Sequence, residues 1–312
     1  MPSTATSQPA EGEWAKVVRG KKSVARDGAA ASQPRASAQR CLKAIMGMSG
    51  SLPYRAQLTS YASWYVAYDG GSSSSRTCTH TGTTTVSAGT LNVGDGSNTT
   101  AALGANTISI GTGATLNFNH SADVTVANAI GGLGALNKVD THTLTLTGVN
   151  SYTGATGTGT AGGVVYTNNT APATSGFTGS GAVTIEPATA SFASAVGANY
   201  TYATTLTGLT LGKAGNLTDM TVDSLVNIAG PITLYAPHIT LNNGNISTLG
   251  GQTYNGAVIL GANTTLSSTG GGDITLGGTV NGAKTLVVNT TGATTFTGAV
   301  GGTTALTSLT TN

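Results

Sequence analysis

The C-terminal part of the sequence reads GANTTLSSTGGGDITLGGTV (261–280), NGAKTLVVNTTGATTFTGAV (281–300) and GGTTALTSLTTN (301–312). Placed in rows of twenty residues, these segments align without gaps. Three columns of apolar residues result: Leu266, Leu286 and Leu306; Leu276 and Phe296; Val280 and Val300. A repeat of roughly 20 to 22 residues, with two or three short strands in each, is typical of a β-solenoid.

In a solenoid each coil adds one rung about 4.8 Å above the last, and its backbone pairs with the coils on either side. The three columns are therefore predicted to form a structural core stack, with Leu266, Leu286 and Leu306 in contact on consecutive coils. An antiparallel sandwich is the alternative, but it requires strands at a spacing of about 8–12 residues and does not explain the gapless alignment.

The segment THTLTLTGVNSYTGAT (141–156) shows the same architecture within one coil. Its threonines from Thr141 to Thr147 alternate with His142, Leu144 and Leu146, and successive side chains of a strand point to opposite faces. Gly148 then interrupts the alternation. This pattern predicts a half-buried strand followed by a turn.

The composition extends this interpretation to most of the chain. Threonine occurs 57 times and glycine 46 times, whereas charged residues make up 8% and aromatic residues 5%. Many β-branched residues separated by glycines favour short strands joined by tight turns. The alternating Leu, Val and Ile positions argue against disorder of this region. The predicted fold class is all-β.

Charge divides the chain into two regions. Residues 1–76 contain 10 Lys/Arg and 4 acidic residues, a net charge of +6, whereas residues 77–312 contain 3 and 7, a net charge of −4. We predict a poorly ordered basic segment over 1–76, with a short helix near RASAQRCLKAIM (35–46), and the β-solenoid over 77–312. WAKVVRGKKSVAR (14–26) could contact nucleic acid or a membrane surface, but a solvated tail is favoured, so no nucleic-acid partner is predicted.

Several segments resemble bacterial surface proteins. GGLGALNKVDTHTLTLTGVNSYTGAT (131–156) resembles the autotransporter-associated β-strand repeat, with its Leu-x-Lys, Thr-Leu-x-Leu-x-Gly and Tyr-Thr-Gly patterns. THTGTTTVSAGTLNVG (79–94) resembles the end of another copy, with His80 where tyrosine is usual. The segment 202–248 and the rows from 253 onward resemble filamentous-haemagglutinin-like proteins.

This resemblance implies a right-handed parallel β-helix, exported across the outer membrane of a Gram-negative bacterium and acting as a stalk in adhesion. It implies a host-cell or matrix surface and an outer-membrane translocator as partners, and a secreted or cell-surface location. No secretory signal is recognisable in residues 1–30. The only cysteines are Cys41 and Cys78, and a body without cysteine suits export through a pore because no disulfide can obstruct it.

The sequence offers little side-chain chemistry. The histidines His80, His120, His142 and His238 are far apart along the chain and lack a partner at metal-ligand spacing. Asp219 and Asp223 are expected about 13 Å apart on one strand, which is too far for a pair of glycosidase carboxylates. We therefore predict no catalytic, cofactor-binding or metal residues, no cofactor and no enzymatic activity.

Three functions fit a solenoid of this composition. A structural adhesin stalk agrees with the repeats and the resemblance. A carbohydrate-active enzyme on a β-helix is the first alternative, but it requires clustered charges that the sequence lacks. An ice-binding solenoid is the second. It requires the same threonine pair on every coil, whereas the rows of twenty place Thr264 over Lys284 and Thr304.

The last row, GGTTALTSLTTN, stops twelve residues into its period. The sequence therefore predicts a solenoid truncated at its C-terminal end, with Leu306 and Leu309 partly exposed. An open end presents unpaired backbone groups. End-to-end self-association is the expected consequence.

Overall fold

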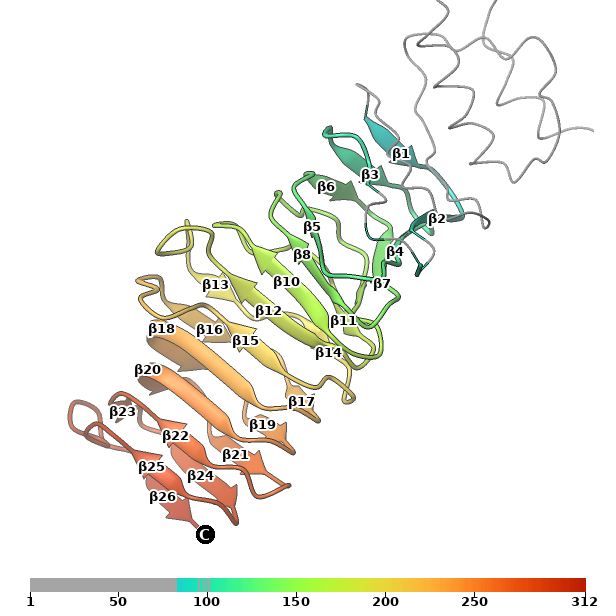
Figure 1. Cartoon of the computed structure of the whole chain (residues 1–312). Coiled ribbons are helices and arrows are strands. Elements are labelled where there is room, and N and C mark those ends of the chain that lie inside the picture. Colours follow the sequence, from blue (N-terminus) through green and yellow to red (C-terminus); the bar gives the residue numbers. More distant parts are fainter. Residues whose placement is uncertain (1–82, 95, 98, 100–101) are drawn as a thin grey trace, which may run out of the picture.

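The computed structural model describes residues 83–94, 96–97, 99 and 102–312, which form a parallel β-solenoid of about 11 turns (Figure 1). These residues contain 26 strands and no helix, and the strands are stacked in parallel from β1 at one end to β26 at the other. The prediction of an all-β solenoid is confirmed. The segment 1–76, its predicted helix, both cysteines and His80 lie outside the described residues.

Each coil of the solenoid passes through three faces. One coil contains β22 (Ile274–Leu276), β23 (Val280–Asn281) and β24 (Thr285–Thr290), which lie on the first, second and third face respectively. The strands of the previous coil and of the next coil pair with these three in parallel. Backbone hydrogen bonds between coils therefore run along the whole body.

The first face is the longest continuous sheet. Its strands, in spatial order, are β5 (Val124–Val126), β8 (Thr143–Leu146), β10 (Gly163–Thr167), β12 (Ala182–Glu186), β15 (Leu209–Leu211), β18 (Ile232–Leu241), β20 (Gln252–Leu260), β22 and β25 (Thr294–Phe296). Strands β18 and β20 continue around a corner onto the second face, where they pair with β16 and β23.

The other two faces complete each coil. The second face carries β1 (Thr84–Val86), β3 (Ile108–Ile110), β6 (Ile130–Gly132), β13 (Val196–Gly197), β16 (Met220–Val222) and β23. The third face begins with β2 (Thr90–Val93), β4 (Thr115–Phe118), β7 (Ala135–Lys138), β9 (Thr156–Gly157), β11 (Gly176–Thr178) and β14 (Thr201–Tyr202). It continues from β14 into β17 (Val226–Ile228), β19 (Asn245–Thr248), β21 (Thr264–Ser268), β24 and β26 (Ser308–Thr311).

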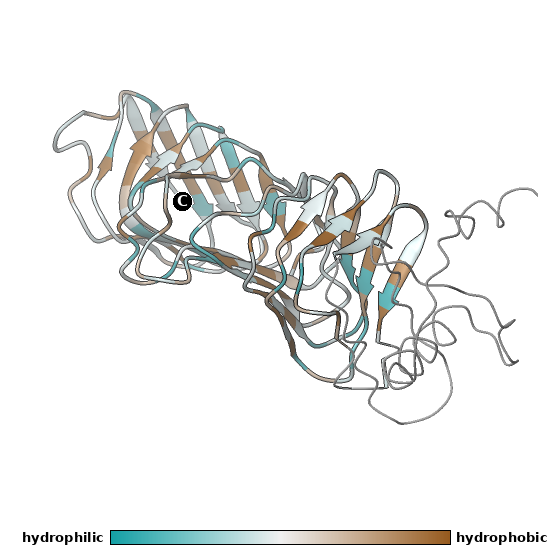
Figure 2. Ribbon diagram, turned by 90° about the horizontal axis from the view of Figure 1, so that it is seen from above, coloured by the Kyte–Doolittle hydropathy of each residue, from teal (hydrophilic) through white to brown (hydrophobic). Residues whose placement is uncertain are grey.

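The core is a column of Leu, Ile and Val side chains inside the coils, with aromatic rings at some levels. Burial alternates along the strands, as in β24, where every second residue is buried, and hydrophobic and hydrophilic positions alternate along the ribbons of Figure 2. The segment 141–156 behaves as predicted, because Leu144 and Leu146 are buried while Thr143 and Thr145 face outward. Period-two alternation therefore accounts for which side chains enter the core.

Two of the three predicted columns have the predicted register. Leu276 pairs with Phe296, and Val280 bridges to Val300, as the rows of twenty require. Leu276 and Val280 are fully buried, whereas Phe296 is only partly buried and Val300 is 36% exposed.

The predicted register of the leucine column is wrong. Leu266 pairs with Val288, and Leu286 pairs with Thr264 on one side and with Leu309 on the other. Loop lengths are the reason. The chain from Leu266 to Leu276 is longer than the equivalent stretch from Val288 to Phe296, and the chain from Val300 to Ser308 is longer than that from Val280 to Thr285. Leu266 and Leu286 are nevertheless both fully buried, because for this pair the true register differs from the predicted one by two positions, which leaves the inward face unchanged. In the next step the difference is three positions, from Leu306 to Leu309.

The last coil has the expected exposure. Every residue of β26 is exposed, Leu309 to 43%, and Leu306 is partly buried against the core.

The length of a coil varies along the body. The offset along the chain between paired residues is short for Met220 and Ile239 and much longer for Val183 and Leu209. The coils are therefore less uniform in length than the sequence predicted, because the loops differ while the strands keep their pairing.

Candidate functional site

A cluster of hydroxyl groups lies inside the coils near β9 and β10. The hydroxyl of Tyr152 is 2.7 Å from that of Thr156 and also bonds to that of Tyr166, and Thr156 donates to the hydroxyl of Thr174 at 3.1 Å. All four side chains are buried. Burial raises the pKa of Tyr152 to about 12 and raises that of Tyr166 as well. These hydroxyls are neutral and satisfy one another, so the cluster stabilises the core and has no access to a substrate.

An aromatic stack continues the cluster toward the next coils. The ring of Phe177 lies 6.2 Å from that of Tyr166, 5.2 Å from Tyr200 and 6.1 Å from Tyr202. Tyr200 donates to the carbonyl of Pro172 at 3.0 Å, whereas the buried hydroxyl of Tyr202 has no hydrogen-bond partner. Aromatic pairs at such distances stabilise cores by about 0.5–1.5 kcal/mol beyond their burial.

A charged group surrounds Asp140. Its carboxylate accepts hydrogen bonds from the backbone amides of His120 and His142, at 2.8 and 2.7 Å, and lies 3.5 Å from the ammonium of Lys138. Lys138 also donates to the carbonyls of Asp140 and Ala161. Burial lowers the pKa of Lys138, and Asp140 acts in the opposite direction. These contacts anchor adjacent coils.

Sequence spacing alone did not reveal this arrangement. The histidines were predicted to lack partners because they are far apart along the chain, but distance along the chain is not distance in space. In a solenoid, residues one coil apart in the sequence are neighbours, as His120 is of Asp140. Within the described part of the chain, however, no three His, Cys, Asp or Glu side chains are placed to hold a metal ion.

The two aspartates that flank β16 have separate partners. Asp219 lies 2.9 Å from the imidazole of His238 on the next coil, while Asp223 accepts hydrogen bonds from Thr221 and Asn242. Both carboxylates are exposed. The two carboxylates are therefore held by different side chains on the outside of the solenoid.

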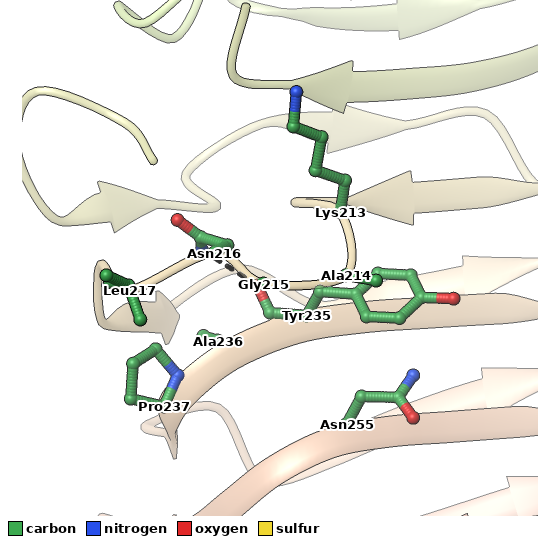
Figure 3. Close-up of a pocket in the computed structure, with 9 residues that line it drawn as sticks. All are labelled: Lys213, Ala214, Gly215, Asn216, Leu217, Tyr235, Ala236, Pro237 and Asn255. Atoms are coloured by element: carbon green, nitrogen blue, oxygen red, sulfur yellow. Dashed lines mark hydrogen bonds between the residues drawn. The ribbon is translucent and has the colours of Figure 1, made fainter. Parts of the chain in front are cut away.

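An open groove of about 450 Å³ lies where β18 turns the corner (Figure 3). It is lined in part by Lys213, Asn216, Tyr235 and Asn255. The amide of Asn216 donates to the carbonyls of Thr218 and Tyr235, and the side chain is buried. In Figure 3, Lys213 and Tyr235 point in different directions, so the polar groups do not converge on one position. The groove lacks the converging groups of a ligand site.

A column of threonines runs along the outside of the first face. It occupies eight of nine consecutive strands, each member paired with the next, and Val165 fills the remaining position. We call this set the threonine column: Thr125, Thr145, Thr184, Thr210, Thr233, Thr253, Thr275 and Thr295. All are exposed or half-buried. The rows of twenty missed it, because the spacing between its members is not constant, as Val165 to Thr184 and Thr184 to Thr210 show.

Comparison of the chain with known protein families, curated proteins and solved structures finds no match. Among the described residues, no helix is long and apolar enough to span a membrane.

Proposed function

We propose that the chain is the structural stalk of a secreted or surface-displayed bacterial adhesin. The observation that supports it is the set of four parallel sheets, which overlap along the axis and together connect the coils from β1 to β26. About 11 turns at roughly 4.8 Å each give a rod about 50 Å long. Such a rod holds its ends apart with backbone hydrogen bonds and requires no side-chain chemistry.

The distribution of charged groups favours a stalk over an enzyme. Asp140, Lys138 and Asp223 are engaged in contacts that hold neighbouring coils together. A carbohydrate-active enzyme requires two carboxyl groups about 5–9.5 Å apart beside a substrate cleft. The resemblance of 131–156 to the autotransporter repeat adds adhesion and export to the proposal, since fold alone does not define function.

Adhesion is tested with beads coated with the full chain. We expect these beads to attach to host cells or matrix more than beads coated with an unrelated soluble protein. Antibodies should also label the chain on the surface of intact bacteria that express it fused to an outer-membrane translocator. Attachment at the control level together with absence of surface labelling would contradict the proposal. Release of reducing ends from polysaccharides by the purified chain would favour the enzyme instead.

A further inference from the structure

The threonine column forms a regular array whose spacing is fixed by the backbone. Parallel strands lie about 4.8 Å apart, so methyl and hydroxyl groups repeat at that distance along the rod. From β12 to β25 the column is unbroken over six strands, from Thr184 to Thr295. Its register follows from the ladder hydrogen bonds and does not depend on flexible loops.

The hydroxyls of the column are free of protein partners. None of them forms a hydrogen bond within the described residues, whereas buried threonines such as Thr156, Thr174 and Thr248 bond to other hydroxyls or to carbonyls. The hydroxyls of the column are therefore available to water along the whole face.

On one side of the threonine column, the neighbouring side chains are short. Two residues before the column, five consecutive strands carry only small or compact residues: Gly163, Ala182, Gly208, Pro231 and Gly251. No charge lies in the column itself, but Glu186 lies two residues after Thr184, and Asp273 lies two residues before Thr275. On this side of the column, a planar solid can approach the five strands without meeting a charged side chain.

We propose that this face binds ice. Waters held by successive hydroxyls repeat at the strand spacing, which is close to the spacing of oxygen rows in hexagonal ice. The column supplies one threonine on each strand and not the pair named above, so the proposed contact is a single row of hydroxyls. The mismatch at Thr264 and Lys284 lies on another face. Thr264 lies on the third face, with its side chain in the core, and pairs with Leu286.

Other occupants fit less well. The face consists of nine strands spaced about 4.8 Å apart and is about 10 Å wide, so its area is roughly 400 Å². A second copy of the chain would bury about half of what each partner buries in a standard interface. Nucleic acid requires cations, and the column has none. A sugar chain would require a row of aromatic rings to stack on, whereas the column has none and Tyr235 beside it is a single ring.

Ice binding is tested on the purified full chain by thermal hysteresis and by partition into a growing ice front. The variant carries Thr210→Lys, Thr233→Lys and Thr253→Lys on three consecutive strands of the column. The matched control carries Asn227→Lys, Ser247→Lys and Ser267→Lys, three outward positions that are stacked in the same way on the third face. Circular dichroism checks folding, and Thr233→Lys alone replaces the triple variant if that variant does not fold.

The parent and the control should show hysteresis and enter the ice, and the column variant should lose both. Val165→Thr, which completes the column, should increase hysteresis. A parent chain without hysteresis, or equal loss in the control, would overturn the inference. A third result would also overturn it: the parent lacks hysteresis and forms a dimer in sedimentation, whereas the column variant stays monomeric. A second copy of the chain would then be the partner of this face. Bead attachment to cells at room temperature is measured separately, so failure here leaves the stalk proposal untouched.

Discussion

At the residue scale, side chains that point into the core hold the coils together, and Leu286 is an example. Its side chain is fully buried between Thr264 and Leu309, whereas its neighbour Val287 points outward and is half-buried. The sequence predicted the inward orientation of Leu286 correctly, because orientation depends only on period-two alternation. It did not predict the contacts, which depend on loop lengths that alternation does not define.

We expect Leu286→Ala to lower the free energy of unfolding by about 2–5 kcal/mol, since truncation of a buried leucine leaves a cavity. Val287→Ala is the matched control on the same strand and should cost about 1 kcal/mol or less. Urea denaturation followed by circular dichroism measures both. Equal costs for the two variants would show that Leu286 does not pack in the core.

At the scale of elements, the corner shared by β18 and β20 allows no side chain at one position. The register between the two strands shifts between Tyr235 and His238, next to Pro237, which cannot donate a ladder hydrogen bond. Opposite it lies Gly256, where an added Cβ would overlap the carbonyl oxygen of Ala236. Only glycine fits this position without displacing the backbone of the neighbouring coil.

Gly256→Val should therefore destabilise the solenoid by about 1–3 kcal/mol, because the added side chain forces the backbone of the neighbouring coil to shift. Gly208→Ala is the control, because a Cβ there has its nearest contact at 3.5 Å, an ordinary distance. That control should leave the midpoint of urea denaturation unchanged or slightly higher, since it reduces the entropy of the unfolded chain. If both variants have the parent midpoint, the corner tolerates a side chain.

For the whole molecule, the sequence predicted the class of fold but not which surface residues are neighbours. Repetition near a period of twenty is sufficient to predict a solenoid. The threonine column, however, becomes visible only after loops such as 187–195 between β12 and β13 have been excluded from the alignment. The contacts of His120 and His142 with Asp140 were missed for a related reason, because separation along the chain was taken for separation in space.

Buried tyrosines spread over several coils make the stability of the whole rod sensitive to alkaline pH. Burial raises the pKa of Tyr152 and of Tyr200 to about 12, and it raises those of Tyr202 and Tyr254. In the unfolded chain tyrosine titrates near pH 10. Up to about pH 10 both states hold these protons, so stability is constant. Above it the unfolded state loses protons first, and stability falls as the pH rises through about 12.

We expect this fall in circular dichroism at fixed urea, together with the rise in tyrosinate absorbance. Tyr202→Phe is the informative variant, because the hydroxyl of Tyr202 is buried without a hydrogen-bond partner. Removing it should stabilise the rod at neutral pH and move the alkaline transition to higher pH, since one raised pKa is eliminated. An alkaline transition at the parent pH in this variant would show that Tyr202 titrates in contact with solvent.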